Sequence, residues 1–312
     1  MNTRQLSYII KVAETRSFSE AAGQLMISQP SLSQYISKIE NEIGLQIFER
    51  TVPLKITYAG EIYLASAKKM LKEEAELEER IADLKGGLSG KLKIGSGYLN
   101  AISLLPRIVS DFQTRYPNVQ IEIYEETEPK LKQMLDDGVL DLVVATSQFN
   151  TPSYEKILLS TEEYLIAIPK FFGAIGLEEP DEQEELDFER KIKIIDFDKL
   201  ENIPLVRLQP NTYMRELIDS LYDNNHIKPR STVECTTAMA AYSMAKRGVG
   251  ATLIPYSLYK SDFSYNINYY SIPDMKKKRK VSIIYNKSRY LNNVSDEFIR
   301  IAQESYADPQ EV

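Results

Sequence analysis

The chain has 312 residues and is acidic, with 38 lysines and arginines, 45 aspartates and glutamates and a formal net charge of −7. This length is enough for two or three domains, and an apolar fraction of 43% is ordinary for a globular protein. The one cysteine, Cys235, excludes a sensor that switches by an internal disulfide and fits a reducing compartment. Because no signal-peptide pattern and no run of about 18 apolar residues occurs, we expect a cytoplasmic protein without a membrane span.

The acidity is concentrated in one part of the chain. The segment 178–189 carries eight acidic residues and no basic one, whereas residues 1–60 carry six basic residues against five acidic ones. DNA carries about one negative charge per 1.7 Å of its axis, and fields from exposed charges are screened beyond about 10 Å at 0.1 M salt. The acidic total therefore does not exclude DNA binding by the N-terminal part.

The first 25 residues predict two amphipathic helices. Leu6, Ile9 and Ile10 follow helical spacing and mark the first one. Either Ser17 or Ser19 can cap the second helix, and Ser17 and Glu20 have the spacing of a capping box.

A third helix is predicted from Ser28 to Gly44. Ser28 is a favourable N-cap, and Pro30 falls in the first turn, where its missing N–H has no intrahelical partner to lose. Gly44 suits the C-cap. Apolar residues recur every three or four positions from Leu32 to Ile43, so one face of this helix is expected to be buried.

The opposite face of the third helix is rich in amide and hydroxyl side chains. A solvated helix surface would explain it, but the preceding helix and tight turn are typical of a helix-turn-helix, and Gln and Ser bond base edges in the major groove. The segment after Arg50 alternates like a strand and predicts a small wing. The expected base contacts are Gln29, Pro30, Ser33 and Gln34, with Ser31 on the same face, and the expected phosphate contacts are Ser28, Ser37, Lys38, Arg50, Lys55 and Thr57.

The stretch "FSEAAGQLMISQPSLSQYISKIENEIGLQIFERT", followed by "ITYAG", resembles the DNA-binding domain of LysR-type transcriptional regulators. The shared pattern is Ala-Ala, Ser-Gln-Pro, Leu-Ser, an apolar-Glu-x-x-apolar-Gly motif, an apolar-Phe-x-Arg motif and Thr-x-x-Gly. Two departures stand out. Gln34 occupies a place where the family often has a base, and "TVPL" between Arg50 and Lys55 is shorter and less basic than the usual wing. The departures imply weaker binding to the DNA phosphates or a different preferred operator.

A long helix is predicted from Gly60 to Leu88, because this segment lacks proline and is rich in Ala, Glu, Lys and Leu. Its apolar residues have coiled-coil spacing. Packing on its own domain is one explanation, but we favour pairing with a second copy, as the resemblance implies for the equivalent helix. The expected dimerisation residues are Leu64, Leu71, Leu77, Ile81 and Leu84.

From Lys91 onward, strand-like and helix-like segments alternate. Strands are predicted at 91–97, 119–125, 140–147, 164–169, 231–235, 251–255 and 280–286, and helices at 101–117, 129–138, 211–225, 236–250 and 294–306. This alternation predicts parallel strands, with ligands bound beyond their carboxyl ends. The order of the segments resembles the LysR-type effector domain, which implies two α/β lobes around a cleft, like periplasmic binding proteins.

The resemblance implies which residues line that cleft, and their polar chemistry suits a small anionic or polar effector. The residues expected to line it are polar and lie at strand ends or helix starts: Ser96, Asn100, Thr127, Thr146, Asn211, Thr236 and Thr237. Each is alternatively a simple cap or turn residue. Leu99 stands where the family commonly has Ser or Thr.

Other motifs carry little functional information. Gly95 to Asn100 matches only part of a dinucleotide fingerprint, and His226 with Cys235 cannot make a recognisable metal site, so no cofactor or metal is expected. The basic run from Lys276 to Lys280 is interpreted as a solvated turn. The acidic segment 178–189 is interpreted as a surface loop whose role the sequence does not indicate.

The sequence therefore predicts an α/β protein with an N-terminal all-α winged helix-turn-helix, acting as a DNA-binding regulator controlled by a small molecule and not as an enzyme. The expected domains are the winged helix-turn-helix at 1–59, a linker helix and hinge at 60–90, and an effector domain at 91–312. One lobe is expected at about 91–163 and 270–312 and the other at about 164–269. A homodimer or homotetramer that contacts RNA polymerase is expected.

Two alternatives remain open. One is an enzyme or small-molecule carrier with an accessory helical domain. The other is a helix-turn-helix domain used only for protein contact.

Overall fold

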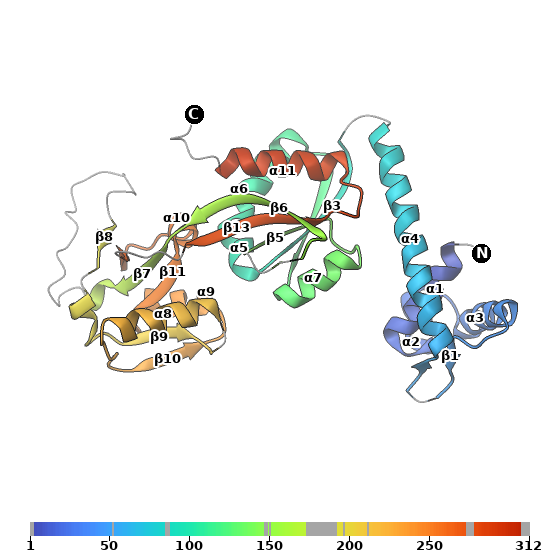
Figure 1. Ribbon diagram of the computed structural model, residues 1–312, viewed down its shortest axis with the longest axis horizontal. Helices are drawn as coiled ribbons and strands as arrows, with labels where there is room; N and C mark the ends of the chain where they lie inside the picture. The colour runs from blue at the N-terminus through green and yellow to red at the C-terminus, as the bar shows by residue number, and fades with distance from the viewer. Residues whose placement is uncertain are drawn as a thin grey trace. The chain divides into compact units, whose positions relative to one another are not determined.

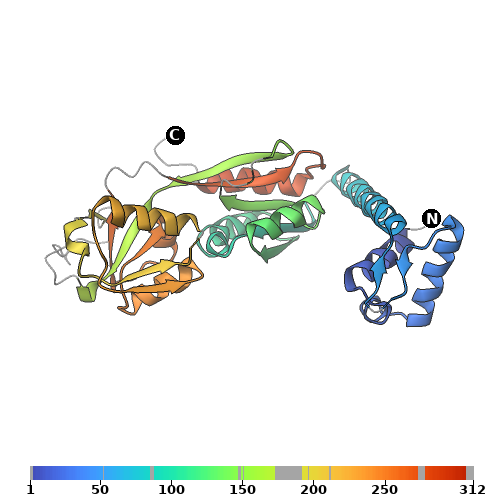
Figure 2. The ribbon, with the colours of Figure 1, turned by 60° about the horizontal axis from the view of Figure 1, so that its bottom comes forward.

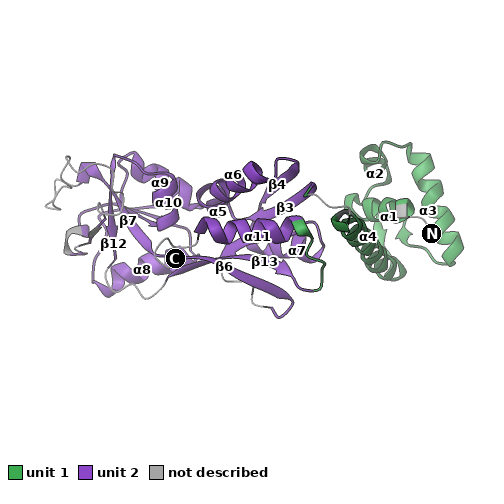
Figure 3. Cartoon of the chain, turned by 90° about the horizontal axis from the view of Figure 1, so that it is seen from above, with its two compact units in different colours: residues 1–88, 288–293 green, residues 89–287, 294–312 purple. Residues whose placement is uncertain are grey.

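The computed structural model describes residues 3–51, 53–84, 88–146, 149, 151–172, 192–195, 197–210, 212–272 and 278–306. The chain divides into two compact units, shown in Figure 3. Unit 1 comprises residues 1–88 and 288–293, and unit 2 comprises residues 89–287 and 294–312. The acidic segment 178–189 and Asn211 lie outside the described residues.

Unit 1 begins with three helices around one core. They are α1 (Thr3–Thr15), α2 (Phe18–Gln24) and α3 (Gln29–Ile43). Ile9, Ala22 and Leu32 meet in this core, as the predicted apolar faces require, but Ile43, at the end of the predicted face of α3, is 39% exposed. The Ser17 hydroxyl accepts a hydrogen bond from the Glu20 amide at 3.3 Å, while the Ser17 amide donates to the Thr15 hydroxyl at 3.4 Å, so Thr15 takes the place of the second capping-box partner.

The predicted boundaries of α3 are confirmed. Ser28 Oγ accepts from the Ser31 amide at 3.3 Å, and Pro30 lies in the first turn. Gly44 ends the helix at a φ of +72°, a left-handed conformation that glycine adopts without steric cost.

A two-stranded wing and a long helix complete the N-terminal part of unit 1. Strands β1 (Phe48–Glu49) and β2 (Lys55–Ile56) pair antiparallel, and α4 runs from Tyr58 to Leu84. Gly60, in the first turn of this helix, lies against the Ile47 carbonyl, where a Cβ atom would overlap the carbonyl oxygen. Unit 1 also includes the segment 288–293, whose Tyr290 hydroxyl donates to the Asp83 carboxylate at 2.9 Å.

Not all of the predicted apolar residues of α4 are exposed on its surface. Leu64 is 7% exposed and packs into the core of its own unit, and Leu71 is half-buried. This corrects the assignment of Leu64, whose heptad spacing coincides with contacts to the three-helix core. The large apolar side chains that remain exposed on α4 are Tyr58, Ile62, Met70, Leu77, Ile81 and Leu84.

Unit 2 contains a five-stranded sheet with the order β4-β3-β5-β13-β6. Its strands are β3 (Gly90–Ser96), β4 (Val119–Glu125), β5 (Leu142–Thr146), β6 (Tyr154–Glu162) and β13 (Arg279–Asn286). Helix α7 (Glu128–Asp136) covers one face, and α6 (Leu105–Arg115) and α11 (Asn293–Tyr306) cover the other (Figure 1).

A second sheet in unit 2 has the order β11-β7-β12-β8. Its strands are β7 (Tyr164–Pro169), β8 (Lys193–Ile194), β11 (Thr252–Pro255) and β12 (Ile267–Ser271), and β9 (Leu205–Leu208) pairs with β10 (Thr232–Cys235) beside it. Alternate residues of β7 face opposite helices: Ile166 packs toward α8 (Tyr213–Asn224), and Ala167 toward α9 (Ala238–Lys246) and α10 (Tyr256–Ser261). Figure 2 shows α8 and α9 on opposite faces of this sheet.

The strand pairing corrects the expectation of a parallel sheet. Strand β3 is parallel to β4 and β5, but β13 runs antiparallel to both β5 and β6, and β7 runs antiparallel to β11 and β12. The chain leaves the first sheet through β6 into β7 and returns through β12 into β13. Strands β6, β8, β9 and β12 have no counterpart among the predicted strands.

The helix predicted at 101–117 is divided in two. Helix α5 (Tyr98–Ser103) ends at Leu104, whose ψ of −49° at a φ of −120° is not helical, and α6 then carries Pro106 in its first turn. Proline lacks the N–H that would continue the ladder from α5, so the break falls just before it.

Candidate functional site

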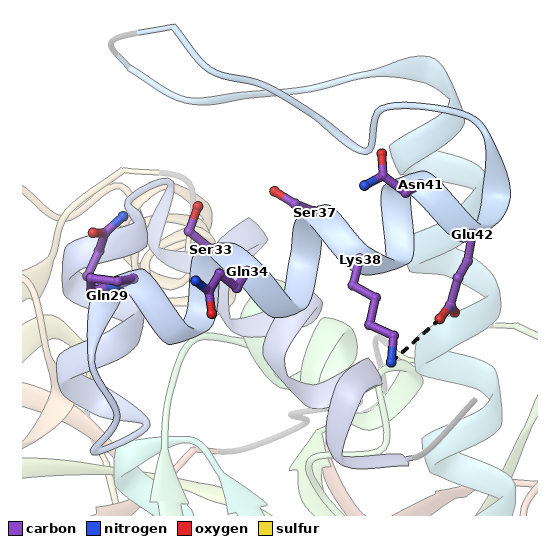
Figure 4. Close-up of a pocket in the computed structure, with 8 residues that line it drawn as sticks. Gln29, Ser33, Gln34, Ser37, Lys38, Asn41 and Glu42 are labelled. Carbon is purple, nitrogen blue, oxygen red and sulfur yellow. Dashed lines mark ion pairs between the residues drawn. The ribbon is translucent and has the colours of Figure 1, made fainter.

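Helix α3 carries the largest group of polar side chains predicted to act together. Its exposed side forms a shallow groove of about 720 Å³. The residues that line it, called here the polar face of α3, are Gln29, Pro30, Ser33, Gln34, Ser37, Lys38, Asn41 and Glu42. Figure 4 shows these side chains along one side of the helix. The structure therefore brings together six predicted contact residues and adds Asn41 and Glu42.

Asn41 and Glu42 follow from the helical repeat. Asn41 lies four residues after Ser37 and Glu42 four residues after Lys38, so extending the predicted stripe by one turn would have found both. Lys38 Nζ lies 4.0 Å from Glu42 Oε1, and both side chains are exposed (Figure 4). The pair lowers the net positive charge on the polar face of α3.

Arg50 lies beside the polar face of α3 and contacts it. Its guanidinium donates to Ser33 Oγ at 3.1 Å and to Ser37 Oγ at 2.7 Å. It also pairs with Glu40 at 3.3 Å and lies 5.4 Å from the centre of the Phe18 ring. The sequence predicted Arg50 as a phosphate contact, whereas in the structure its guanidinium is bonded to three side chains of α3.

Besides Ser33 and Ser37, three further predicted contact hydroxyls, those of Ser28, Ser31 and Thr57, have partners inside unit 1. Thr57 Oγ1 donates to the Gln46 carbonyl at 2.6 Å and accepts from the Gly60 amide at 2.9 Å. The bond from the Gly60 amide makes Thr57 the cap at the start of α4. Its hydroxyl hydrogen is already donated to Gln46 and is not left for a phosphate oxygen, which corrects its assignment to phosphate. Ser28 caps α3, and its hydroxyl lies 2.7 Å from that of Ser31. Lys55, on β2, is exposed.

In unit 2, the predicted effector residues on the first sheet fall at strand ends, as expected. Ser96 ends β3, Thr146 ends β5, and Thr127 precedes α7. Ser96 is fully buried and its hydroxyl lies 3.2 Å from the Val144 carbonyl. Thr127 is exposed, whereas the hydroxyls of Ser96 and Thr146 both donate to partners inside the protein.

Asn100 is also buried with both ends of its amide engaged. It is 4% exposed, its Nδ2 donates to the Val144 carbonyl at 3.2 Å, and its Oδ1 accepts from Arg279. Arg279 is 6% exposed and pairs with Glu162, which is 5% exposed. The interpretation of the basic run 276–280 as a solvated turn is therefore wrong at Arg279, because β13 places this residue opposite Glu162 on β6.

The buried carboxylate of Glu162 connects the two lobes further. Its Oε2 accepts from the Ser257 amide on α10 at 2.6 Å, and Ser257 Oγ lies 3.3 Å from Ser103 Oγ on α5. We call Asn100, Ser103, Glu162, Ser257 and Arg279 the crossover network, because it lies where β6 and β13 pass between the sheets. This network bonds the two lobes to each other where they connect. The sequence did not indicate it, because its members lie up to 179 residues apart in the chain.

Glu128 and Thr146 form the adjoining polar pair. Thr146 Oγ1 donates to Glu128 Oε1 at 3.1 Å. Burial raises the pKa of the Glu128 carboxyl above its ordinary value, although the Thr146 hydroxyl and the charge of Arg279 act in the opposite direction. The sequence interpretation did not single out Glu128, although it directly follows Thr127.

On the second lobe, Thr236 and Thr237 lie between β10 and α9. Thr237 Oγ1 accepts from the Ala240 amide at 3.2 Å and caps α9. Thr236 is exposed. Cys235, at the end of β10, is buried, and its burial raises the pKa of the thiol.

Membrane-spanning helices and metal clusters are absent from the described residues. Among them, no helix combines the length and apolar character needed to cross a bilayer. In the same part of the chain, no three His, Cys, Asp or Glu side chains are grouped so as to hold a metal ion.

The chain is similar to known regulators over nearly its whole length. It is 26% identical to the uncharacterized HTH-type transcriptional regulator YcgK of Bacillus subtilis, over 98% of this chain and 95% of that protein. It is 26% identical to the HTH-type transcriptional regulator BenM of Acinetobacter baylyi, over 88% of this chain and 86% of that one.

Solved structures share the fold. Full-length CbnR complexed with its target DNA aligns with a TM-score of 0.64 at 22% identity, covering 98% of this chain and 100% of that one. A full-length OxyR variant from Pseudomonas aeruginosa aligns with a TM-score of 0.66 at 23% identity, covering 98% and 94%. The predicted fold class, a winged helix-turn-helix followed by a two-lobed α/β effector domain, is confirmed.

Two family models account for both parts of the chain. Residues 3–61 match the bacterial regulatory helix-turn-helix protein of the lysR family, and residues 85–307 match the LysR substrate binding domain. The polar face of α3 and the two-lobed unit 2 lie within these matched ranges. The chain therefore belongs to the LysR family of DNA-binding transcriptional regulators, with an effector-binding domain after its helix-turn-helix.

Proposed function

We propose that this regulator reads a specific operator with the polar face of α3 and that a small polar molecule in unit 2 modulates the binding. The observation that carries the proposal is the groove on α3, where amide and hydroxyl side chains project outward while Leu32, Ile36 and Ile39 are buried behind them. Amides and hydroxyls bond the base edges exposed in the major groove, which is wide enough for a helix.

Base reading is assigned to Gln29, Ser33, Gln34 and Ser37, and to Asn41 at the end of the groove. A Gln or Asn amide can bond N6 and N7 of adenine with two hydrogen bonds. Phosphate contact is assigned to Lys38 and Lys55, which are exposed. CbnR, a LysR family transcriptional regulator that is similar in fold, has been solved complexed with its target DNA, which supports this use of α3.

Self-association is assigned to the exposed apolar residues of α4. Met70, Leu77, Ile81 and Leu84 follow a spacing of seven, four and three residues, as in a coiled-coil seam. Two copies of α4 would place two α3 helices on one DNA, and each copy would contribute a half-site. A tetramer would then be a dimer of such dimers.

The effector is assigned to the cleft between the lobes of unit 2. Thr127, Thr146, Thr236 and Thr237 remain our candidates for lining it, together with Glu128. We assign Asn100 and Ser96 to holding the wall of the cleft in place and not to ligand contact, because their polar atoms are bonded within the protein. A ligand can change operator binding only if it has different affinities for the two subunit arrangements.

The remaining proposals concern context. We propose that the protein works in the cytoplasm, contacts RNA polymerase at a promoter and catalyses no reaction. We also propose the domain limits 1–59, 60–90 and 91–312, with lobes at about 91–163 and 270–312 and at about 164–269.

The test is selection from a library of random DNA duplexes, followed by binding measurements at several salt concentrations. Gln29→Ala should lose about 1–3 kcal/mol of discrimination at one base pair. Lys38→Ala should weaken binding to all sequences and reduce the salt slope by about 0.9. Gln24→Ala, an exposed glutamine at the end of α2, is the matched control and should change neither quantity. Absence of salt-dependent binding by the unmodified protein would refute the proposal.

A further inference from the structure

Arg50 holds two serines of α3 through a fork of hydrogen bonds. Nη1 donates to Ser33 Oγ at 3.1 Å and Nη2 donates to Ser37 Oγ at 2.7 Å. These two serines are one helical turn apart on the polar face of α3, so a single guanidinium spans the middle of the face.

A buried carboxylate fixes the position of this fork. Glu40 is 8% exposed, and its Oε1 accepts from the amides of Ile47 and Phe48 at 2.9 and 3.2 Å. Its other oxygen, Oε2, accepts from Arg50 Nη2 at 3.3 Å. Because both oxygens of Glu40 are engaged and the Phe18 ring lies 5.4 Å from the guanidinium carbon, the orientation of Arg50 is set by the core of unit 1.

The arginine changes what the serines offer to a ligand. A serine hydroxyl has one hydrogen to donate and two lone pairs to accept with. Arg50 occupies one lone pair of each oxygen, and its permanent positive charge favours the orientation in which the hydroxyl hydrogen points away from it. Ser33 and Ser37 are thereby left with an outward-facing donor.

We propose that Arg50 is a positioning residue that makes Ser33 and Ser37 select base edges carrying acceptors. This inference rests on the proposed binding of DNA by the polar face of α3. In the major groove the acceptors are N7 and O6 of guanine, N7 of adenine and O4 of thymine, whereas N4 of cytosine and N6 of adenine are donors. An amino group that approached either serine would meet the hydroxyl hydrogen and, behind it, the charge of Arg50.

Ser31 provides an internal comparison on the same helix. Its hydroxyl lies 2.7 Å from that of Ser28, and either oxygen can be the donor. No arginine bond is recorded for Ser31 within the described residues, so the bias imposed on Ser33 and Ser37 does not extend to it.

The rival explanation is that Arg50 itself binds a phosphate, and the two roles predict different measurements. A phosphate contact contributes to affinity for every sequence and to the salt slope. A positioning role contributes to discrimination between bases and acts through Ser33 and Ser37. Arg50→Lys separates them, because lysine keeps the charge but cannot bond both serines and Glu40 with one planar fork.

The experiment selects duplexes from a random library with the full-length protein, Arg50→Lys, the double variant Ser33→Ala/Ser37→Ala, and the triple combination. The expected result is that Arg50→Lys loses about five- to tenfold discrimination against cytosine or the adenine amino group at the affected position, with an unchanged salt slope. In the Ser33→Ala/Ser37→Ala background, adding Arg50→Lys should produce no further loss. Ser31→Ala is the control and should leave this discrimination intact.

Three outcomes overturn the inference. One is equal weakening of all sequences by Arg50→Lys with no loss of discrimination between bases, as a phosphate contact predicts. Another is the same loss of discrimination with and without the two serines. If Arg50→Lys does not fold, Ser33→Ala/Ser37→Ala still decides, because unchanged discrimination in that variant contradicts the proposal. Failure of the unmodified protein to enrich any sequence would instead refute the proposed function.

Discussion

The polar face of α3 and the crossover network contain similar residue types in opposite situations. On α3, Gln29, Gln34 and Lys38 are exposed and lie along a groove. In the crossover network, Asn100, Glu162 and Arg279 are at most 6% exposed and bond one another. Both sets are polar residues on or beside a helix or at a strand end, so local sequence alone does not separate them.

The difference shows what makes a polar residue available to a ligand. A buried polar group must be hydrogen-bonded, so the buried side chains of Asn100, Glu162 and Arg279 are committed to the protein. An exposed polar group exchanges its bonds with water and can offer them to DNA instead. Changes at Arg279, Thr57 and Glu128 test this contrast between committed and available groups, and a change at Met26 tests the turn that positions α3.

The largest expected effect is from Arg279→Met. Glu162 would remain buried without its partner, and breaking a buried ion pair in this way destabilises a protein by about 3–5 kcal/mol. Urea unfolding of the full chain, followed by circular dichroism, measures the change. Lys278→Met is the matched control, since Lys278 pairs with Glu163 on the surface and exposed pairs contribute about 0–1 kcal/mol. Equal stability of the two variants would show that Arg279 is not a structural residue.

The next effect separates Thr57 from Lys55 in the wing. Thr57→Val removes the hydroxyl that caps α4 and should lower stability by about 0.5–2 kcal/mol without changing the salt slope of DNA binding. Lys55→Ala should leave stability unchanged and reduce the slope by about 0.9. Thr57→Ser keeps the hydroxyl and serves as the control. A reduced slope for Thr57→Val would restore its assignment as a phosphate contact.

A smaller effect is expected at Met26, in the turn before α3. Met26 is 92% exposed and has a φ of +55°, a left-handed conformation in which a side chain is strained. Met26→Gly should raise the melting temperature, with a gain of up to about 1 kcal/mol. His226→Gly makes the same change in unit 2, at a φ of +57°. Ser19→Gly, inside α2, is the opposite control and should destabilise by about 0.5–1 kcal/mol.

The smallest effect concerns the pH dependence of unit 2. Burial raises the pKa of Glu128 above 4.5, so the folded protein holds this proton more tightly than the unfolded chain. Stability from this group is therefore present below 4.5 and is lost as the pH rises through the folded pKa. The Glu128→Gln variant has no proton to lose at this position, so its stability should not fall over this pH range. It should melt at a slightly higher temperature than the unmodified protein at neutral pH. Melting temperatures measured from below pH 4.5 to neutral pH test the prediction, with Glu125→Gln, a change at an exposed glutamate, as control. Identical pH profiles for Glu128→Gln and the unmodified protein would contradict it.

Much of α3 could be predicted because the information is local. Ser28, Pro30 and Gly44 define the ends of the helix through their own backbone preferences. Leu32, Ile36 and Ile39 define its buried face through spacing alone. Asn41 and Glu42 were missed although the same repeat continues through them, so the signal was present in the sequence.

Other assignments needed contacts between residues far apart in the chain. Arg50 bonds Ser33, 17 residues earlier, and Arg279 bonds Asn100, 179 residues earlier. Leu64 has heptad spacing but packs against the three-helix core, which the repeat does not reveal. The reversed directions of β13 and β7 likewise depend on where the chain crosses between the sheets.

The sequence by itself determined the helix-turn-helix, the outward polar side of α3 and the order of the strands and helices it detected in unit 2, because helix caps and periodicity act over a few residues. The tertiary structure alone decided which of those polar groups are available. Arg50, Thr57, Asn100 and Arg279 are each engaged by partners that only the folded chain brings within hydrogen-bonding distance. Availability for a ligand is a property of burial and of completed hydrogen bonds, and neither can be read from neighbouring residues in the sequence.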